Sequence, residues 1–146
     1  MRQARKSDAR AVHALLWACR SDIPLTDKFI NHEYRDWAER YCKKRAVWVV
    51  EHNGDVAGAM VMLAHEIFYL VVAATHRRKG VAQTLIGQAK RYAVNKRWNG
   101  LKAKTNPENI PVQRLLRKED FYEDSIESDL KWKVFYWKKA SARQRR

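Results

Sequence analysis

The sequence is poor in cysteine, the residue that cross-links many small proteins. It contains two, Cys19 and Cys42, in 146 residues, and each falls in a segment with helical spacing of apolar side chains. Neither belongs to a Cys-x-x-Cys or Cys-His pattern, which argues against a disulfide framework or a zinc-binding scaffold. We interpret both cysteines as reduced packing residues.

Long apolar runs are also missing. The longest, residues 56–64 and 67–74, are far shorter than the ~20 residues that a membrane-spanning helix needs, and they predict buried strands instead. The first residues are polar and basic, without an apolar stretch followed by a small-residue cleavage site. We therefore expect a cytoplasmic protein with no membrane partner.

Two common phosphate-binding motifs do not occur. The chain contains neither Gly-x-x-x-x-Gly-Lys-Ser/Thr nor Gly-x-Gly-x-x-Gly, which disfavours P-loop nucleotide hydrolysis and a standard dinucleotide-binding fold. The five histidines form no helical i, i+4 pair, and no carboxylate cluster has metal-ligand spacing. We therefore expect no metal.

Positive charge is abundant and unevenly placed. The formal net charge is +14; residues 76–146 carry 19 Lys/Arg against 7 Asp/Glu, whereas residues 1–75 carry 11 against 9. Such a field attracts coenzyme phosphates, acidic proteins and nucleic acid alike. The length and the 46% hydrophobic content predict one domain over residues 1–138, followed by a basic, flexible tail at 139–146. The oligomeric state stays open.

The hydrophobic pattern predicts a mixed α and β chain. Apolar spacing indicates helices over 7–19 and from Thr26 or Asp27 to about Tyr41, and Asn53-Gly54 indicates a hairpin turn. Strands at 46–51 and 56–63 flank this turn. The elements predicted after them are a strand at 66–73, a helix at 81–96, a strand at 100–105, a helix at 109–118, and strands near 121 and at 132–137. The strand–helix–strand unit within this order predicts one parallel strand pair with a ligand site at its carboxyl ends.

One loop has the chemistry of an anion site. An apolar strand runs through Arg77-Arg78-Lys79-Gly80-Val81-Ala82 directly into a helix. The first-turn N–H groups of a helix are unpaired and the helix dipole is positive there, so a diphosphate can accept several hydrogen bonds. Gly80 and Ala82 allow close approach of the backbone. The alternative is an ordinary solvated basic turn.

This loop resembles the signature of the GNAT superfamily of acetyl-CoA-dependent N-acyltransferases, Gln/Arg-x-x-Gly-x-Gly/Ala after a strand. Arg77-x-x-Gly80-x-Ala82 fits it, and Asn109 followed twelve residues later by Phe121 keeps a second family spacing. The element order agrees over nearly the whole chain. The resemblance implies an α/β (α+β) fold: a mixed, mainly antiparallel sheet with one central parallel βαβ pair and helices on both faces.

The resemblance also implies acetyl-CoA as co-substrate. Its pyrophosphate would bind the basic loop, its pantetheine arm the preceding strand end, and a backbone N–H near Val72 would stabilise the oxyanion. The coenzyme-binding residues expected in this way are Val72, Ala73, Ala74, Arg77, Arg78, Lys79, Gly80, Val81, Ala82 and Asn109.

For catalysis, the resemblance nominates Glu66, eleven residues before Arg77, as general base, acting directly or through water. The alternative is a strand-end glutamate without a catalytic role. The usual tyrosine acid of the family falls at Leu116, a departure from the pattern, so acid assistance would come from Tyr122 or water, or the coenzyme would leave as thiolate. Asp120 stands where the family commonly has glycine.

The resulting hypothesis is an N-acetyltransferase that moves acetyl from acetyl-CoA to a primary amine by direct attack in a ternary complex. The basic C-terminal half favours an acceptor on an acidic macromolecule, either a protein or an aminoacyl-tRNA. A different class is kept beside it: a GNAT-like binding module without catalysis that holds nucleic acid or a partner protein. Leu116 supports that alternative.

Overall fold

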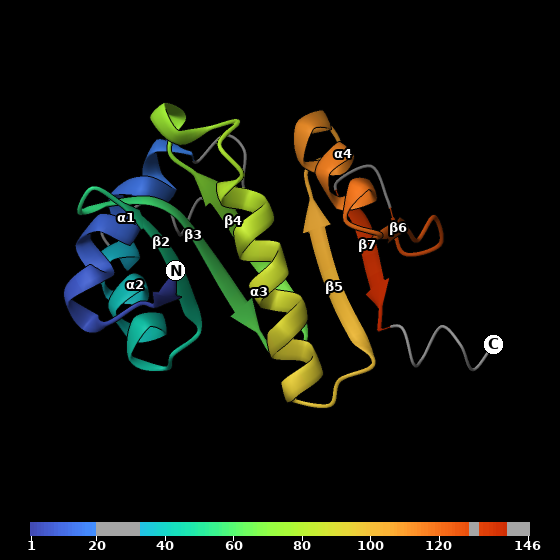
Figure 1. Ribbon diagram of the computed structural model, residues 1–146, viewed down its shortest axis with the longest axis horizontal. Coiled ribbons are helices and arrows are strands. Elements are labelled where there is room, and N and C mark those ends of the chain that lie inside the picture. The colour runs from blue at the N-terminus through green and yellow to red at the C-terminus, as the bar shows by residue number, and fades with distance from the viewer. Residues whose placement is uncertain (20–32, 129–131, 140–146) are drawn as a thin grey trace.

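A seven-stranded sheet organises the molecule (Figure 1). The computed structural model describes residues 1–19, 33–128 and 132–139. The strands are β1 (Arg2–Gln3), β2 (Val47–His52), β3 (Asp55–Leu63), β4 (Glu66–Val72), β5 (Gly100–Thr105), β6 (Tyr122–Glu123) and β7 (Lys133–Lys138). Their order across the sheet is β1-β2-β3-β4-β5-β7-β6.

The helices of the described residues lie on both faces of this sheet. They are α1 (Ala9–Ala18), α2 (Glu33–Lys43), α3 (Val81–Asn95) and α4 (Ile110–Lys118), with short 3-10 turns η1 (Lys6–Asp8) and η3 (Ala74–His76). Figure 1 shows α3 and α4 on one side of the sheet, and α1 and α2 on the other side, beneath β2 and β3. The predicted arrangement of helices is confirmed.

Strand pairing is antiparallel at every neighbouring pair except β4 and β5, which run parallel. The predicted parallel βαβ pair and the mixed, mainly antiparallel sheet are therefore confirmed. The hairpin turn between β2 and β3 is confirmed as well: Asn53 and Gly54 both have positive φ, 52° and 84°. That backbone suits the right-handed twist of two adjacent antiparallel strands.

Two apolar cores form, one on each face. Val12, Leu16, Val49, Ala59 and Val71 belong to the core beneath α1 and α2, where Cys19 and Cys42 are also buried, each as a thiol and not in a disulfide. The second core joins α3 and α4 to the other face of the sheet; it contains Met60, Ile67, Leu85, Ile86, Ala89, Leu101, Leu116 and Phe135. The sheet is thus fixed in position from both sides along its centre.

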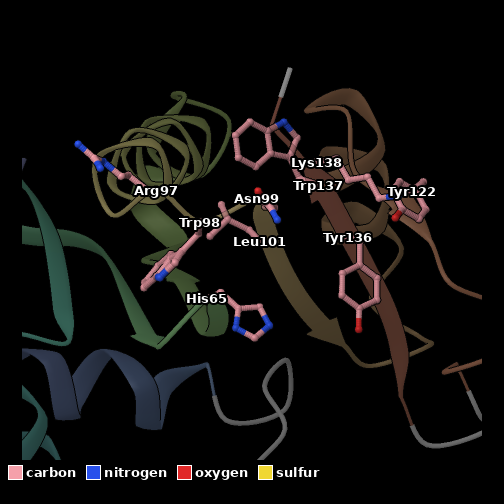
Figure 2. A pocket seen from close by; sticks show the side chains of 10 residues that line it. His65, Arg97, Trp98, Asn99, Leu101, Tyr122, Tyr136, Trp137 and Lys138 are labelled. Atoms are coloured by element: carbon pink, nitrogen blue, oxygen red, sulfur yellow. The ribbon is translucent and has the colours of Figure 1, made fainter. Parts of the chain in front are cut away.

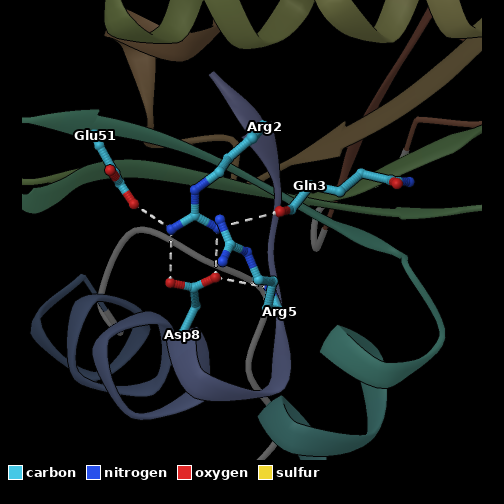
Figure 3. A network of polar contacts seen from close by, with 5 residues as sticks. All are labelled: Arg2, Gln3, Arg5, Asp8 and Glu51. Atoms are coloured by element: carbon cyan, nitrogen blue, oxygen red, sulfur yellow. Dashed lines mark hydrogen bonds and ion pairs between the residues drawn. The ribbon is translucent and has the colours of Figure 1, made fainter.

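The N-terminal segment adds a strand that the sequence pattern did not predict. Arg2 and Gln3 pair with β2, and the Arg2 guanidinium contacts both oxygens of Asp8, at 2.6 and 2.9 Å, and also Glu51 (Figure 3). The Asp8 carboxylate further accepts the Arg5 backbone N–H at 2.7 Å. This network ties β1, η1 and β2 together.

Some expectations lie outside the described residues. The predicted helix cap at Thr26 or Asp27 and most of the basic tail are among them. Within the part of the chain that the structure describes, no helix has the length and apolar character needed to cross a membrane.

Candidate active site

The parallel strands β4 and β5 separate soon after they begin. Among the described residues they pair only through Glu66 with Lys102 and Ile67 with Ala103. Beyond this point β4 continues to Val72 while β5 leads away toward α4 (Figure 1). The sheet therefore opens between its two central strands, on the carboxyl side where the sequence predicted a ligand site.

The backbone of β4 presents hydrogen-bonding groups to this opening. Ala73 donates its N–H to Ala57 of β3 at 2.8 Å, and Val71 is paired with Ala59. Successive residues of a strand direct their N–H and C=O groups to opposite sides. Leu70 and Val72 consequently direct theirs away from β3, toward the side from which β5 has departed.

A pocket occupies the opening. Its walls are Ile67 to Leu70 on β4, Ala103 to Thr105 on β5, and Asn109, Val112 and Leu116 at α4. Leu116, which replaces the expected tyrosine acid, is 2% exposed and lies in this wall. Residue 116 therefore lies inside the candidate site, and a leucine there offers an apolar surface and cannot donate a proton.

The basic loop leads from β4 into α3 as the sequence predicted. Gly80 adopts the left-handed conformation, φ 77°, at the N-cap of α3, and it has no side chain to cap the helix. Thr84 donates the first helical hydrogen bond, to Gly80 at 3.0 Å. The N–H groups of Val81, Ala82 and Gln83 precede that bond, which is the arrangement that binds anions at helix N-termini.

Three cations directly precede this helix end in the chain. Arg77, Arg78 and Lys79 are exposed, and Arg78 has a left-handed backbone, φ 63°. The Arg77 side chain folds back so that its Nε lies 3.4 Å from the Val72 carbonyl oxygen. Ala74 lies in the turn η3 between the strand end and these cations. The structure thus brings strand end, cationic loop and helix N-terminus together.

Gly58 is a residue of this site that sequence reasoning missed. A Cβ on Gly58 would stand 2.5 Å from Val81 Cγ1 and 3.1 Å from the Val71 carbonyl oxygen. The absence of a side chain lets the first turn of α3 rest directly on β3. The only sequence signal was a glycine within an apolar strand, which often marks close backbone approach.

Glu66 lies where the two strands separate, on the sheet face opposite α3. Ile67, its neighbour, packs into the α3 core, and alternation along the strand places Glu66 on the other face. Its Oε1 is buried and has no hydrogen-bond partner among the described residues, while Lys104 Nζ lies 4.0 Å away. A buried, unsatisfied carboxylate oxygen is poised to accept a donor from a ligand.

Tyr122 lies far from Glu66 in the same row of side chains. The register joins Glu66 to Lys102, Lys102 to Tyr136, and Tyr136 to Tyr122. Three interstrand spacings of about 4.8 Å separate the ends of this row, roughly 14 Å of sheet. The structure therefore does not bring the two predicted catalytic side chains together.

The C-terminal wall of the site depends on the ends of α4. Asn109 is the N-cap, and its Oδ1 accepts the Val112 N–H at 3.4 Å. At the other end, Asp120 has a left-handed backbone, φ 68°. That conformation explains why glycine is common at this position in the family that the sequence resembles.

The structure is an α/β fold in which a parallel strand pair opens beside a bare helix N-terminus. The model of the acetyltransferase (GNAT) family matches residues 9–121. The chain therefore belongs to the GNAT family, and the resemblance seen in the sequence is confirmed.

Solved structures agree with this assignment of the fold. PaiA N-acetyltransferase from Thermoplasma acidophilum, in complex with coenzyme A, superposes with a TM-score of 0.76 at 12% identity, covering 94% of this chain and 97% of that chain. Ribosomal-protein-alanine N-acetyltransferase from Brucella melitensis gives 0.74 at 18% identity, with 94% and 98% covered.

A curated relative is similar over a shorter segment. Streptothricin acetyltransferase from Escherichia coli is 40% identical over 55 residues, 38% of this chain. The chain matches 32%, about a third, of that relative's length. Among the described residues, no three His, Cys, Asp or Glu side chains gather in an arrangement that could hold a metal ion.

Proposed function

We propose that the protein is an acetyl-CoA-dependent N-acetyltransferase that acts on a primary amine by direct attack in a ternary complex. The observation that carries the proposal is the uncapped N-terminus of α3 beside the opening between β4 and β5. The first-turn N–H groups and the three exposed cations suit a pyrophosphate. The backbone N–H and C=O of Leu70 and the N–H of Val72 suit the amides of a pantetheine arm.

In this proposal Glu66 accepts the proton of the incoming ammonium, directly or through a water. Its buried Oε1 without a hydrogen-bond partner supports the role, as does its place where the strands separate. The neutral amine then attacks the thioester carbonyl carbon, and the carbonyl oxygen takes up negative charge. The Val72 N–H is our candidate for stabilising that charge.

The carbon–sulfur bond then breaks and the coenzyme sulfur carries away the electron pair. Leu116 supplies no proton, and Tyr122 lies roughly 14 Å of sheet from Glu66 by three spacings of about 4.8 Å. The sequence left three sources of acid assistance open: Tyr122, water, or none, with the coenzyme leaving as thiolate. Water and unassisted departure of the thiolate therefore have better support than Tyr122. A thiol with a pKa near 8.5 is a tolerable leaving group.

The acceptor is proposed to carry negative charge around its amine. Lys102 and Lys104 project on the same face as Glu66, and Lys104 Nζ is 4.0 Å from Glu66. Lys102 is paired with Glu127 at 3.0 Å, so Lys104 and the basic C-terminal half supply the positive field that repels a polyamine and attracts an amine on an acidic protein or an aminoacyl-tRNA. Of the relatives, one is named for a ribosomal protein alanine and one for streptothricin, so both acceptor types belong in the test panel.

The test measures coenzyme binding and acetyl transfer separately. Calorimetry should show micromolar or tighter acetyl-CoA binding by the wild type, and Gly80→Glu should abolish it by placing a carboxylate at the pyrophosphate site. A Cβ at Gly80 meets only Gln83 Oε1, at 3.7 Å, so Gly80→Ala controls for backbone strain at φ 77°. Unchanged affinity in a folded Gly80→Glu protein would remove the loop assignment.

Thiol release should then be followed with an alanyl peptide, an aminoacyl-tRNA and streptothricin. Acetylation of any of these amines supports the enzyme. Coenzyme binding without turnover on any amine would favour the GNAT-like binding module instead.

A further inference from the structure

A pocket of about 610 Å³ lies at the opposite end of α3 from the coenzyme loop. It is formed around the start of β5, between the C-terminal end of α3 and the end of β7 (Figure 2). The 15 residues of α3 separate the two sites by about 22 Å at 1.5 Å per residue. We propose that this pocket binds an unstacked base and the flanking phosphates of a single-stranded nucleic acid.

Aromatic side chains give the pocket its flat surfaces. Trp98 and His65 flank one side of the strand start and Tyr136 the other, with Tyr122 beyond it (Figure 2). The Tyr122 and Tyr136 rings are inclined at 32° with centroids 6.3 Å apart, and Tyr122 is 42% exposed. A partly exposed tyrosine ring can stack on a nucleobase once the flexible Lys138 side chain moves to the phosphate.

Cations complete the pocket, and none of its ten lining residues is acidic. Lys138 Nζ lies over the Tyr122 ring, 5.8 Å from its centre, whereas the exposed Arg97 lies on the other side of the pocket with its guanidinium directed outward (Figure 2). Cations beside an aromatic platform allow one nucleotide to be held by base stacking and phosphate contact together.

An acidic group that contacts the pocket lining is already engaged. Glu127 accepts the Tyr136 hydroxyl at 2.7 Å and pairs with Lys102 Nζ at 3.0 Å. Its negative charge is therefore offset by a lysine on the same face. An approaching phosphate meets a surface that is positive overall, consistent with the +12 net charge of residues 76–146, 19 basic against 7 acidic.

The shape favours a single strand over a duplex. Bases in a duplex are stacked and paired, so their faces cannot reach an aromatic side chain in a recess. An acidic peptide could pair with Arg97 and Lys138, but it would leave the aromatic surfaces without a flat partner. A nucleotide uses both components of the pocket, because its base stacks on the aromatic rings and its phosphate pairs with the cations.

The experiment measures binding of a fluorescein-labelled RNA of about ten nucleotides, without coenzyme, by anisotropy at several salt concentrations. Its outcome therefore does not depend on acetyl transfer. Tyr122→Ala should weaken binding about tenfold, and Tyr122→Phe, which keeps the ring, should restore it. The double variant Arg97→Gln, Lys138→Gln should reduce the slope of the logarithm of the binding constant against the logarithm of the salt concentration. The reduction should correspond to the loss of about one to two phosphate contacts.

The matched control is Arg10→Gln with Arg40→Gln, which removes the same charge from exposed positions on α1 and α2. If the control pair loses as much affinity as the pocket pair, attraction is a property of total charge and the proposal fails. It fails equally if Tyr122→Ala binds as wild type, if a duplex or polyglutamate competes as well as the single strand, or if no RNA binds at low salt.

Discussion

Gly58 on β3 lies directly beneath Val81, the first residue of α3, so closely that an added Cβ would stand 2.5 Å from Val81 Cγ1. The helix end that we assign to the pyrophosphate is therefore held in place by the absence of a side chain. Its position depends on a residue more than twenty places earlier in the chain.

Gly58→Ala should lower the free energy of unfolding by about 1 to 3 kcal/mol, because the extra methyl overpacks a rigid contact. It should also weaken acetyl-CoA binding, since α3 must move away from β3. Urea unfolding and calorimetry measure the two effects. Gly87→Ala is the control: its Cβ meets only Arg91 Nη1, at 3.7 Å, within the same helix, and it should stabilise by about 0.5 to 1 kcal/mol. Equal behaviour of both variants would contradict the contact.

Glu66→Gln should retain acetyl-CoA affinity and lower the acetylation rate about a hundredfold or more, because the amide cannot accept the ammonium proton. Turnover on a verified acceptor across about pH 6 to 9 is the measurement, and the pH profile should change with it. Glu108→Gln, an exposed glutamate beyond β5, serves as the control. Wild-type turnover in Glu66→Gln would show that the proton leaves by another route, such as a water chain.

The Arg2–Asp8 pair predicts a pH dependence of stability. Hydrogen bonding to Arg2 lowers the pKa of Asp8. A carboxyl whose pKa is lower in the folded than in the unfolded state stabilises the fold above its unfolded pKa of about 3.9, and this stabilisation is lost as pH falls through the folded pKa. Asp8→Asn should therefore cost about 1 kcal/mol at neutral pH, and the wild type should lose this advantage in acid.

Urea unfolding of both proteins at pH values from about 7 down to 2 tests this expectation. In a double-mutant cycle, Arg2→Gln should cost less in the Asp8→Asn background than in the wild type, because the two side chains share one interaction. A constant difference between wild type and Asp8→Asn over the whole range would exclude the ion pair as its cause.

Asp120→Gly should stabilise the protein by about 0.5 to 1 kcal/mol, since Asp120 holds a left-handed backbone with φ 68° after the end of α4. Asp120→Ala should destabilise it, because alanine lacks the short polar side chain that tolerates this conformation. Thermal unfolding ranks the three proteins. Equal stability of the glycine and alanine variants would mean that this backbone carries no strain.

Local signals made much of the fold predictable. Asn53-Gly54 specifies a tight turn by its own conformational preferences, and the spacing of Val81, Leu85 and Ala89 specifies a helix face. The βαβ unit follows from element order alone. The cationic loop was predictable for the same reason, because residues 77 to 82 are contiguous and their chemistry needs no distant partner.

Long-range relationships were not predictable. The pairing of Arg2 with Val49 and the seating of Val81 on Gly58 join segments separated by tens of residues, and no periodicity records them. Tyr122 illustrates the same limit. The sequence offered it as a source of acid assistance because Leu116 replaces the usual tyrosine, whereas the pairing order places β7 between it and β5. The proximity of Lys104 to Glu66 follows from the register between β4 and β5, which the sequence alone does not give.

The early separation of β4 and β5 also has a consequence for solvent exchange. Val71 is paired with Ala59 and the Ala73 amide is bonded to Ala57, so both amides lie within the β3–β4 ladder. The intervening amides of Leu70 and Val72 face the opening. Deuterium uptake along this strand should therefore alternate from one residue to the next, fast at 70 and 72 and slow at 71 and 73, and a bound pantetheine arm should slow the fast positions selectively.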